Sequence, residues 1–575
     1  MKIKKQGIIM MVVAFVATFP SAALALFSDQ AEGKWSLNGQ FKTQATVRTE
    51  DGPPNTPIPY EKGDMTSQRN LLMLEWKHDL GEPFFGIKAE YNIKVRSYYD
   101  GAWQYGPKQM SDDDYRQRYV LNNRAVVDDR EEINKSLRKA RTPELFNAYV
   151  DMSKGPLFTR IGRQVLSWGE MSTIRILDGC NPMDTSSLAV DMQERLIPLW
   201  MVRANLAFDS VGPFESMSLG GYYVPGKIDN TYEETMIDGS PIMPPIGRDT
   251  EAELALPFSM STIKQFIRQT DSKIDEDRFG VKLGVMYKGM DLNLAYYRMY
   301  SERPVPQLQE QFIQPMEVNP LNINIHNPMS TVLGSQFLVV EKTRDTVDVF
   351  GGSLNKNIDA INTVLRAEGA YFKDVPMQSP GTLLDVVGAL EPHVTITNLN
   401  QSLNELLGIF PLGPIATQTF PYVVGKIPKY DMIKYGIGLD KWINIPFLSK
   451  NDFLFTFEYV GTKIQDYQKK AIINPWYEPW DKDKDGNWDP TYVSEYNNTF
   501  ILVSRGNYLN GNLNPQCVAM YEVEPKALVL IPSVAYSYNK FNFNLSYFMT
   551  EAKDAEDLGM LDKYDELSFS VTYSF

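Results

Sequence analysis

The last nine residues of the chain, Leu567 to Phe575, alternate apolar and small polar side chains without a break. Successive side chains of a β-strand point to opposite faces, so this segment has one apolar face and one face of serine and threonine. A strand with one face for lipid and one for water is typical of a transmembrane β-barrel. The alternative is an amphipathic edge strand of a soluble sheet.

The same alternation recurs along the chain and predicts antiparallel strands that come in pairs. The predicted strands span residues 34–50, 67–80, 84–99, 144–152, 157–166, 199–209, 215–224, 278–288, 291–300, 343–355, 361–372, 431–442, 452–465, 526–538, 540–549 and 564–575. Single-chain bacterial barrels have an even number of strands. We therefore predict an all-β, antiparallel transmembrane barrel of about sixteen strands, within a range of 14 to 18.

The connections between these strands alternate in length. Short ones carry turn chemistry, as in Ser153-Lys154-Gly155-Pro156 and Ser210-Val211-Gly212-Pro213, whereas the others mostly run for tens of residues. Short periplasmic turns and long outer loops are the asymmetry of outer-membrane barrels. An even strand number then places both termini in the periplasm.

The amino-terminus has the three parts of a secretory signal: early lysines, an apolar run from Ile8 to Phe19, and the small-residue site Ala23-Leu24-Ala25. This pattern predicts a cleaved signal peptide over residues 1–25 and one mature domain over 26–575. No later stretch has the roughly 18 uninterrupted apolar residues that a helical membrane span requires. A membrane location would therefore need a barrel.

Charge and the two chain ends together predict the location and the partners. Removal of Lys2, Lys4 and Lys5 with the signal leaves 54 basic and 71 acidic residues, a net charge of about −17, which argues against a nucleic-acid partner. The aromatic carboxy-terminus is similar to the signal read by the barrel assembly machinery. We expect a protein of the Gram-negative outer membrane, in contact with its lipid.

Alternation in the clearer strands also predicts which side chains face the lumen. In residues 84–99, for example, Ile87 and Ile93 would face lipid, which turns Lys88 and Arg96 inward. A charge on the lipid face near the midplane costs roughly 2–4 kcal/mol, so charged positions belong inside. The charged residues predicted to line the wall are Lys88, Arg96, Arg203, Arg278, Lys282, Arg366 and Glu368. They serve either as a solute-selecting lining or as hydrated salt bridges of the wall.

One segment resembles a known family. The series Gly162-Arg163-Gln164, Trp168-Gly169-Glu170 and Asn181-Pro182 is similar to one found after an early strand in proteobacterial outer-membrane proteins of domain-of-unknown-function family 1302. The similarity extends over most of the mature chain. Genes of that family often accompany efflux-type transporters, so the resemblance implies membrane transport, with periplasmic or inner-membrane transporter components as partners, and names no solute.

This segment stands where a strand gives way to a loop. Gly169 permits a sharp turn into the barrel mouth. We therefore expect an inward-folded constriction, formed by Arg163, Trp168, Glu170 and Asp178. The alternative is a structural tie between Arg163 and Glu170 that fixes the loop.

A short acidic segment predicts a weak structural calcium site and no other cofactor. Asp481, Asp483 and Asp485 stand at the first, third and fifth positions of a calcium loop, Gly486 follows at the sixth, and Asp489 stands at the ninth. Position twelve is a tyrosine in place of the bidentate glutamate, which weakens the expected affinity. An acidic solvated loop is the alternative.

Cys180 and Cys517 are the only cysteines, and both fall in predicted outer loops of an exported chain. An oxidising compartment favours a disulfide between them, but the sequence leaves open whether the two loops meet.

Three function classes remain open. Apolar residues in predicted outer loops, as at residues 241–246, 254–266 and 403–410, either plug the barrel or form an entry site for hydrophobic compounds. We predict a channel for the passive passage of small molecules. A plugged surface barrel that binds or adheres is the runner-up. A lipid hydrolase is weaker, because the three histidines stand in no nucleophile context and no Gly-x-Ser-x-Gly elbow occurs, so we do not expect an enzyme.

Overall fold

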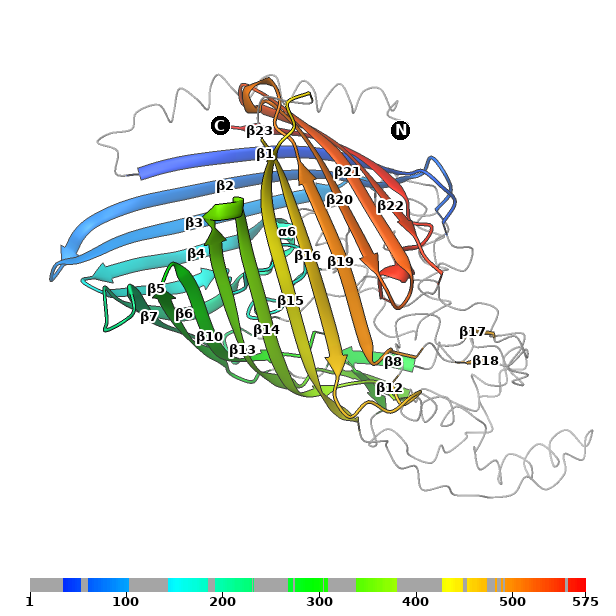
Figure 1. Cartoon of the computed structure of the whole chain (residues 1–575), viewed down its shortest axis with the longest axis horizontal. Coiled ribbons are helices and arrows are strands. Elements are labelled where there is room, and N and C mark those ends of the chain that lie inside the picture. The colour runs from blue at the N-terminus through cyan, green and yellow to red at the C-terminus, as the bar shows by residue number, and fades with distance from the viewer. Residues whose placement is uncertain are drawn as a thin grey trace, which may run out of the picture.

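Antiparallel strands follow one another in chain order around a closed barrel (Figure 1). The computed structural model describes residues 35–52, 60–102, 143–184, 192–229, 231, 267–271, 275–302, 305–308, 338–379, 427–447, 452–472, 481–482, 488–489, 492–553 and 557–575. The eighteen barrel strands are β1 (Trp35–Arg48), β2 (Met65–Phe84), β3 (Ile87–Asp100), β4 (Pro143–Lys154), β5 (Leu157–Gln164), β6 (Leu199–Phe208), β7 (Ser216–Val224), β9 (Arg278–Tyr287), β10 (Met290–Tyr300), β13 (Thr346–Ile358), β14 (Thr363–Pro376), β15 (Lys429–Asn444), β16 (Asp452–Ile464), β19 (Tyr496–Arg505), β20 (Leu513–Glu522), β21 (Ala527–Tyr538), β22 (Phe541–Glu551) and β23 (Glu566–Ser574).

This architecture confirms the predicted all-β barrel at the upper end of the predicted range. All sixteen predicted strands correspond to barrel strands, and the pair that the sequence analysis missed is β19 with β20. The reason is visible on β19, where the inward side chains Ile501 and Val503 are buried in an apolar cluster inside the barrel. Both faces of this strand are therefore apolar, and the alternation that marks the other strands is lost.

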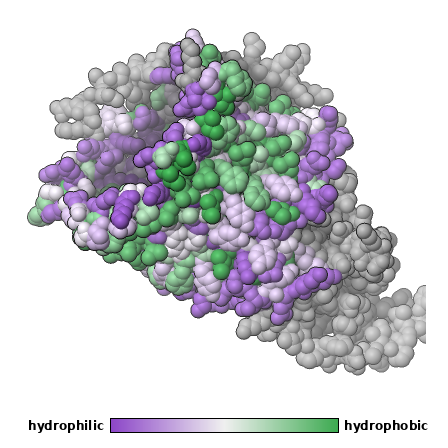
Figure 2. Space-filling view, viewed as in Figure 1, coloured by the Kyte–Doolittle hydropathy of each residue, from purple (hydrophilic) through white to green (hydrophobic). Residues whose placement is uncertain are grey.

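The two faces of the wall differ in the expected way. Large apolar side chains are exposed on the outer face, as at Leu219, Leu294, Phe350 and Phe569. Figure 2 shows hydrophobic residues gathered across the middle of the wall, with hydrophilic residues toward its ends. An apolar band of this kind is the surface that lipid covers in an outer-membrane barrel.

The connections also alternate as predicted. Tight turns, such as Gly155-Pro156 and Lys288-Gly289, join strands at the end where the carboxy-terminus lies, and most long connections lie at the other end. The connection from β20 to β21 is an exception, since it is short and lies at the long-loop end.

The described residues outside the barrel wall form a few small elements. They are the helix α6 (Met192–Arg195), the sheet of β8 (Ile267–Asp271), β11 (Val305–Leu308) and β12 (Leu338–Thr343), and the hairpin of β17 (Asp481–Lys482) with β18 (Trp488–Asp489). No helix in this part of the chain is both long and apolar enough to span a membrane. The predicted signal peptide lies outside the described residues. The apolar loop segments at 241–246, 254–266 and 403–410 also lie outside them.

The seam between the first and last strands depends on the carboxy-terminal residue. Gly39 on β1 and Phe575 exchange two backbone hydrogen bonds, of 2.8 and 2.9 Å. A Cβ atom at position 39 would lie 2.1 Å from the Phe575 ring. The ring can therefore lie against the outer face of β1 at this point because residue 39 has no side chain. The aromatic end of the chain thus helps to close the barrel.

A valine at position 39 should weaken this seam. We expect Gly39→Val to lower the free energy of unfolding by about 1–3 kcal/mol, because the added methyl groups collide with the Phe575 ring. Urea unfolding of the barrel in micelles measures this change. Gly369→Val is the matched control, since a Cβ atom at residue 369 meets nothing within 4 Å. Equal stability of the two variants would contradict the role of the seam.

Candidate functional site

The connection between β5 and β6 folds into the lumen and crosses it. We call residues 165–198 the strap; the structure describes 165–184 and 192–198 of it. Its first half contacts β14 and β16, whereas α6, in its second half, contacts β1, β2 and β3. The strap therefore reaches two separate parts of the wall.

Asp178 fixes the first turn of the strap. Its carboxylate accepts hydrogen bonds from the Ser167 hydroxyl at 3.0 Å, from the backbone N–H of Trp168, and from that of Gly169 at 2.8 Å. A carboxylate that accepts several N–H bonds replaces the ladder partners that these residues lack outside a sheet.

Asn181 fixes the return of the strap to the wall. Its side-chain oxygen accepts from the Leu166 N–H at 2.7 Å, and its amide nitrogen donates to the Gln164 and Ile197 carbonyls at 3.3 and 2.9 Å. The Asn-Pro pair of the family-like motif thus joins the end of β5 to the approach to β6.

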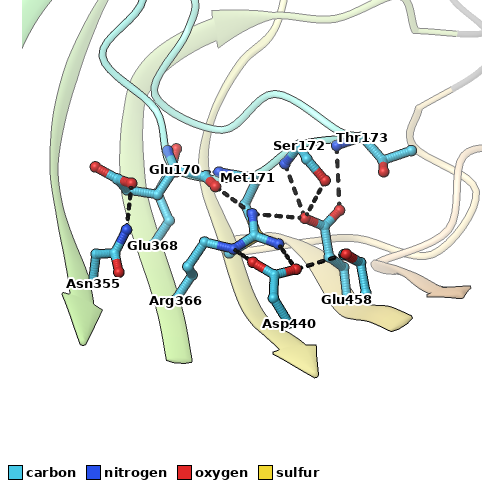
Figure 3. A network of polar contacts seen from close by, with 10 residues as sticks. Glu170, Met171, Ser172, Thr173, Asn355, Arg366, Glu368, Asp440 and Glu458 are labelled. Atoms are coloured by element: carbon cyan, nitrogen blue, oxygen red, sulfur yellow. Dashed lines mark hydrogen bonds and ion pairs between the residues drawn. The ribbon is translucent and has the colours of Figure 1, made fainter. Parts of the chain in front are cut away.

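Glu368 on β14 anchors the strap to the far wall. This buried carboxylate accepts the backbone N–H groups of Glu170 at 2.6 Å, Met171 at 3.2 Å and Leu177. Figure 3 shows the strap passing above the strands that carry these anchors. Three otherwise orphaned N–H groups of an irregular segment therefore share one acceptor.

A second anchor lies one strand further on. The fully buried carboxylate of Glu458 on β16 accepts from the Ser172 N–H at 2.9 Å and hydroxyl at 2.8 Å, and from the Thr173 N–H at 3.2 Å (Figure 3). The same carboxylate pairs at 3.0 Å with the guanidinium of Arg366. The charge of the anchor is thus balanced inside the wall.

Arg366 connects the two anchors. It forms a bidentate ion pair with Asp440 on β15, in which both N···O distances are 3.0 Å, and it donates to the Glu170 carbonyl of the strap (Figure 3). Planar bidentate pairing fixes the guanidinium more firmly than a single contact. The wall and the strap are therefore one connected polar network.

An apolar cluster fills the space between the strap and the wall. Trp168 lies edge-on to the rings of Tyr222 on β7 and Tyr297 on β10, at centroid distances of 5.1 and 6.0 Å. Leu177 and Ile176 are buried in the same cluster. Burial of large side chains stabilises by about 1.5–3 kcal/mol each, so this contact contributes strongly to the fixed position of the strap.

Wall glycines make room for these side chains. A Cβ atom at Gly351 on β13 would lie 2.5 Å from Leu177, and one at Gly436 on β15 would lie 2.9 Å from Ile176. The strands beneath the strap are thus shaped to receive it at close range.

The second half of the strap is held by cations of the opposite wall. The Glu194 carboxylate lies 3.0 Å from Lys42 Nζ on β1 and 3.7 Å from Arg69 on β2, and the Glu194 carbonyl accepts from Arg96 on β3 at 2.6 Å. Arg96 also pairs with Glu144 on β4. Anchors at both ends make the strap a bridge across the lumen.

Most residues predicted for the constriction belong to the strap network. Trp168 and Asp178 act as described above, and the Glu170 carboxylate accepts from the Asn355 side chain at 3.2 Å (Figure 3). Arg366 and Glu368, predicted for the wall, lie beneath the strap. Lys282 donates to the Trp168 carbonyl at 3.4 Å.

The position of Arg163 contradicts its predicted place in the constriction. The register of β5 and β6 pairs Arg163 with Trp200, next to the pair of Ile161 and Val202, which are exposed on the outer face. Its side chain therefore starts on the outside of the wall. The segment alternates inside and outside until residue 164, and the inward turn begins only after it.

The other three predicted wall residues also start on inward positions of their strands, but in different surroundings. Arg278 is buried and donates to the carbonyls of Thr231 and Asp229, so it holds an outer loop. Arg203 lies on the inner face with its guanidinium 5.3 Å from the centroid of the Phe158 ring. Lys88 is exposed and pairs in register with residue 153, close to a short turn.

Four residues of this network were not among the predicted site residues: Asp440, Lys42, Arg69 and Glu194. The alternation of β15 could have shown that Asp440 shares the inward face of Gly436 and Gly438. Nothing in the sequence around Glu194 shows that this residue reaches wall partners that stand 98 to 152 residues earlier in the chain.

The two cysteines form no disulfide, and their predicted placement in outer loops is wrong for Cys517. Both thiols are free. Cys517 lies on β20 and shares the outer face with the exposed Tyr521, whereas Cys180 is buried inside the barrel, so the wall separates them. Burial raises the pKa of the Cys180 thiol to about 12.

The calcium prediction remains open. Asp481 and Asp489 pair in the β17–β18 hairpin, but Asp483 and Asp485 lie outside the described residues. Within the described part of the chain, no group of three potential metal ligands occurs.

Removal of the Glu368 carboxylate should loosen the strap. We expect Glu368→Ala to lower the free energy of unfolding by about 2–4 kcal/mol, because three backbone N–H groups lose their acceptor. Urea unfolding in micelles measures the effect. Glu90→Ala removes an exposed carboxylate of the β3 wall and serves as control. If both variants unfold alike, Glu368 does not anchor the strap.

The cysteine positions make a second prediction. Barrel purified without reductant should contain two free thiols per chain. Titration of the denatured protein with a thiol reagent measures this number. A value near zero would show that the two cysteines pair.

Comparison with known proteins places the chain in a family. The solved structures similar to it include OccAB1 of Acinetobacter baumannii, with 11% identity and a TM-score of 0.42 over 94% of this chain and 96% of that one. OccD3 (OpdP) of Pseudomonas aeruginosa has 7% identity and a TM-score of 0.41, over 95% and 91% of the two chains. An anion-selective porin from Comamonas acidovorans has 8% identity and a TM-score of 0.35, over 94% and 99%. No curated protein matches the chain. The model of the family described as "Protein of unknown function (DUF1302)" matches residues 6–575, and the protein belongs to that family.

Proposed function

We propose that the protein is a channel of the Gram-negative outer membrane for the passive passage of small molecules, with the strap as its constriction. The observation that carries this proposal is the strap itself, which is anchored to β14 and β16 at one end and to β1, β2 and β3 at the other. A barrel of this strand number leaves an aqueous lumen unless loops fill it. A fixed segment across that lumen would set the size and charge of what passes.

The wall that the strap leaves uncovered supports a path for water. On β21, β22, β23 and β1 many of the side chains opposite the lipid-facing ones are hydroxyls and amides, although β21 also has apolar inward residues such as Val529 and Ile531. These inward hydroxyls and amides, which we call the polar wall, are Gln40, Gln44, Thr46, Ser533, Asn544, Ser546, Ser568 and Ser570. Neutral donors and acceptors hydrate readily and hold solutes without trapping them.

This distribution favours polar solutes over hydrophobic compounds. The apolar residues of the inner wall, such as Tyr297, Val349 and Ile501, are buried beneath the strap. A hydrophobic solute would have to displace the strap in order to reach them, whereas a polar solute meets the half-buried members of the polar wall, such as Gln40 and Ser546, directly. We therefore propose small polar molecules as the solute class.

A plugged barrel that binds partners at its surface is the second candidate. It is favoured by the same double anchoring, because a strap held at both walls narrows the lumen. The two candidates differ in ion flow, which the prediction below measures.

Cooperation with a periplasmic or inner-membrane transporter component is a further part of the proposal. The β2–β3 hairpin continues past the last described pairing of β2 with β1, at His78 and Trp35, and turns at Phe85, which is 89% exposed. The extra six residues correspond to roughly 20 Å. A projection at the short-turn end supports a contact with a periplasmic protein.

Release of the strap should widen the channel. We expect the refolded barrel to show small, steady conductance in planar bilayers, and the double variant Glu368→Ala/Glu458→Ala to conduct severalfold more, because the strap loses both carboxylate anchors. Glu90→Ala should conduct like the unchanged protein. A folded barrel that is silent both with and without the anchors would contradict the channel and favour the surface-binding candidate.

A further inference from the structure

Three cations on the inner face of the barrel converge on one residue of the strap, Glu194. Lys42, Arg69 and Arg96 stand on the neighbouring strands β1, β2 and β3. Lys42 and Arg69 contact the Glu194 carboxylate, and Arg96 donates to the Glu194 backbone carbonyl. The side chains are largely buried, with 17%, 16% and 8% exposed. Cations held at such low exposure need an anionic partner.

Aromatic rings hold the two guanidinium groups in place. Arg69 lies over the ring of Tyr98 at 4.8 Å, and Arg96 lies over that of Phe146 at 4.4 Å. Arg96 is also paired with Glu144 on β4. The two guanidinium groups are therefore positioned by the wall, independently of the strap.

Glu194 satisfies these cations only in part. Its carboxylate oxygen is 3.7 Å from Arg69, beyond hydrogen-bond distance, and the buried Nε of Arg69 has no hydrogen-bond partner among the described residues. A carboxylate free of the strap could approach Arg69 with both oxygens, which is the geometry that a guanidinium prefers. The site has more donor capacity than its resident carboxylate uses.

We propose that Lys42, Arg69 and Arg96 form a binding site for the carboxylate of a small organic anion, and that Glu194 occupies this site as a tethered substitute. The inference rests on the proposed channel, whose solute class it narrows from polar molecules to organic carboxylates. The site borders the polar wall through Gln44, which pairs in register with Arg69. Binding of the anion releases α6 from β1–β3 and widens the path along that wall.

Calorimetric titration with benzoate tests the site on the full mature barrel in detergent micelles. The unchanged protein should bind benzoate weakly, because Glu194 competes. Glu194→Gln removes the competing charge and keeps the side-chain volume, so it should bind benzoate at least tenfold more tightly. Adding Arg69→Gln to that variant should abolish this gain. Lys154→Gln, at the exposed end of β4, is the control and should bind like the unchanged protein.

Two further ligands define the chemistry. Benzamide, which has the same shape without the charge, should not bind, and phosphate should bind less tightly than benzoate. The proposal is overturned if Glu194→Gln gains no affinity for benzoate while remaining folded, or if phosphate binds more tightly. Calorimetry does not depend on ion flow. A barrel that binds benzoate but does not conduct in bilayers would therefore support the binding site and contradict only the proposed channel.

Discussion

The width of an eighteen-stranded barrel is the constraint on which the rest of this structure depends. Wall side chains cannot fill a lumen of this size, and a polypeptide that enters it leaves the hydrogen-bonded sheet. The strap meets this difficulty with carboxylates: Asp178 accepts from the first turn of the strap itself, and the buried Glu368 and Glu458 of the wall also accept from the strap. Each accepts several backbone N–H groups that would otherwise lack partners.

The same solution explains why the inner wall is divided. Beneath the strap, β7 to β19 carry aromatic and aliphatic side chains that pack against it, with glycines where the approach is closest. On the other side, β21 to β1 carry many hydroxyls and amides, and β1 to β3 present the cations that hold Glu194. The proposed channel would select solutes through the residues that border the strap, whereas the apolar part of the inner wall holds the strap.

Sequence patterns predicted the wall better than the lumen. Alternation located sixteen strands because lipid outside and water inside impose opposite chemistry on neighbouring residues. It failed at β19, where the strap makes the inner face apolar as well, so that Ile501 and Val503 look like lipid-facing positions. The motif around Trp168 correctly indicated an inward loop, but the partners of that loop on β14–β16 and β1–β3 depend on strand order and register. Arg163 shows the limit of such patterns, because a shift of one residue in the strand register moves a side chain from the inner to the outer face.

A zero-length carbodiimide coupling tests most directly whether the strap crosses the lumen. Lys42 Nζ and the Glu194 carboxylate lie 3.0 Å apart, so the folded barrel should yield an amide link between the β1 peptide and the α6 peptide on mass spectrometry. Lys429 and Asp345, 2.7 Å apart, provide an internal control for the reagent. Both links are expected in the folded protein and neither after unfolding. A control link without the Lys42–Glu194 link would show that the strap does not cross the lumen to β1.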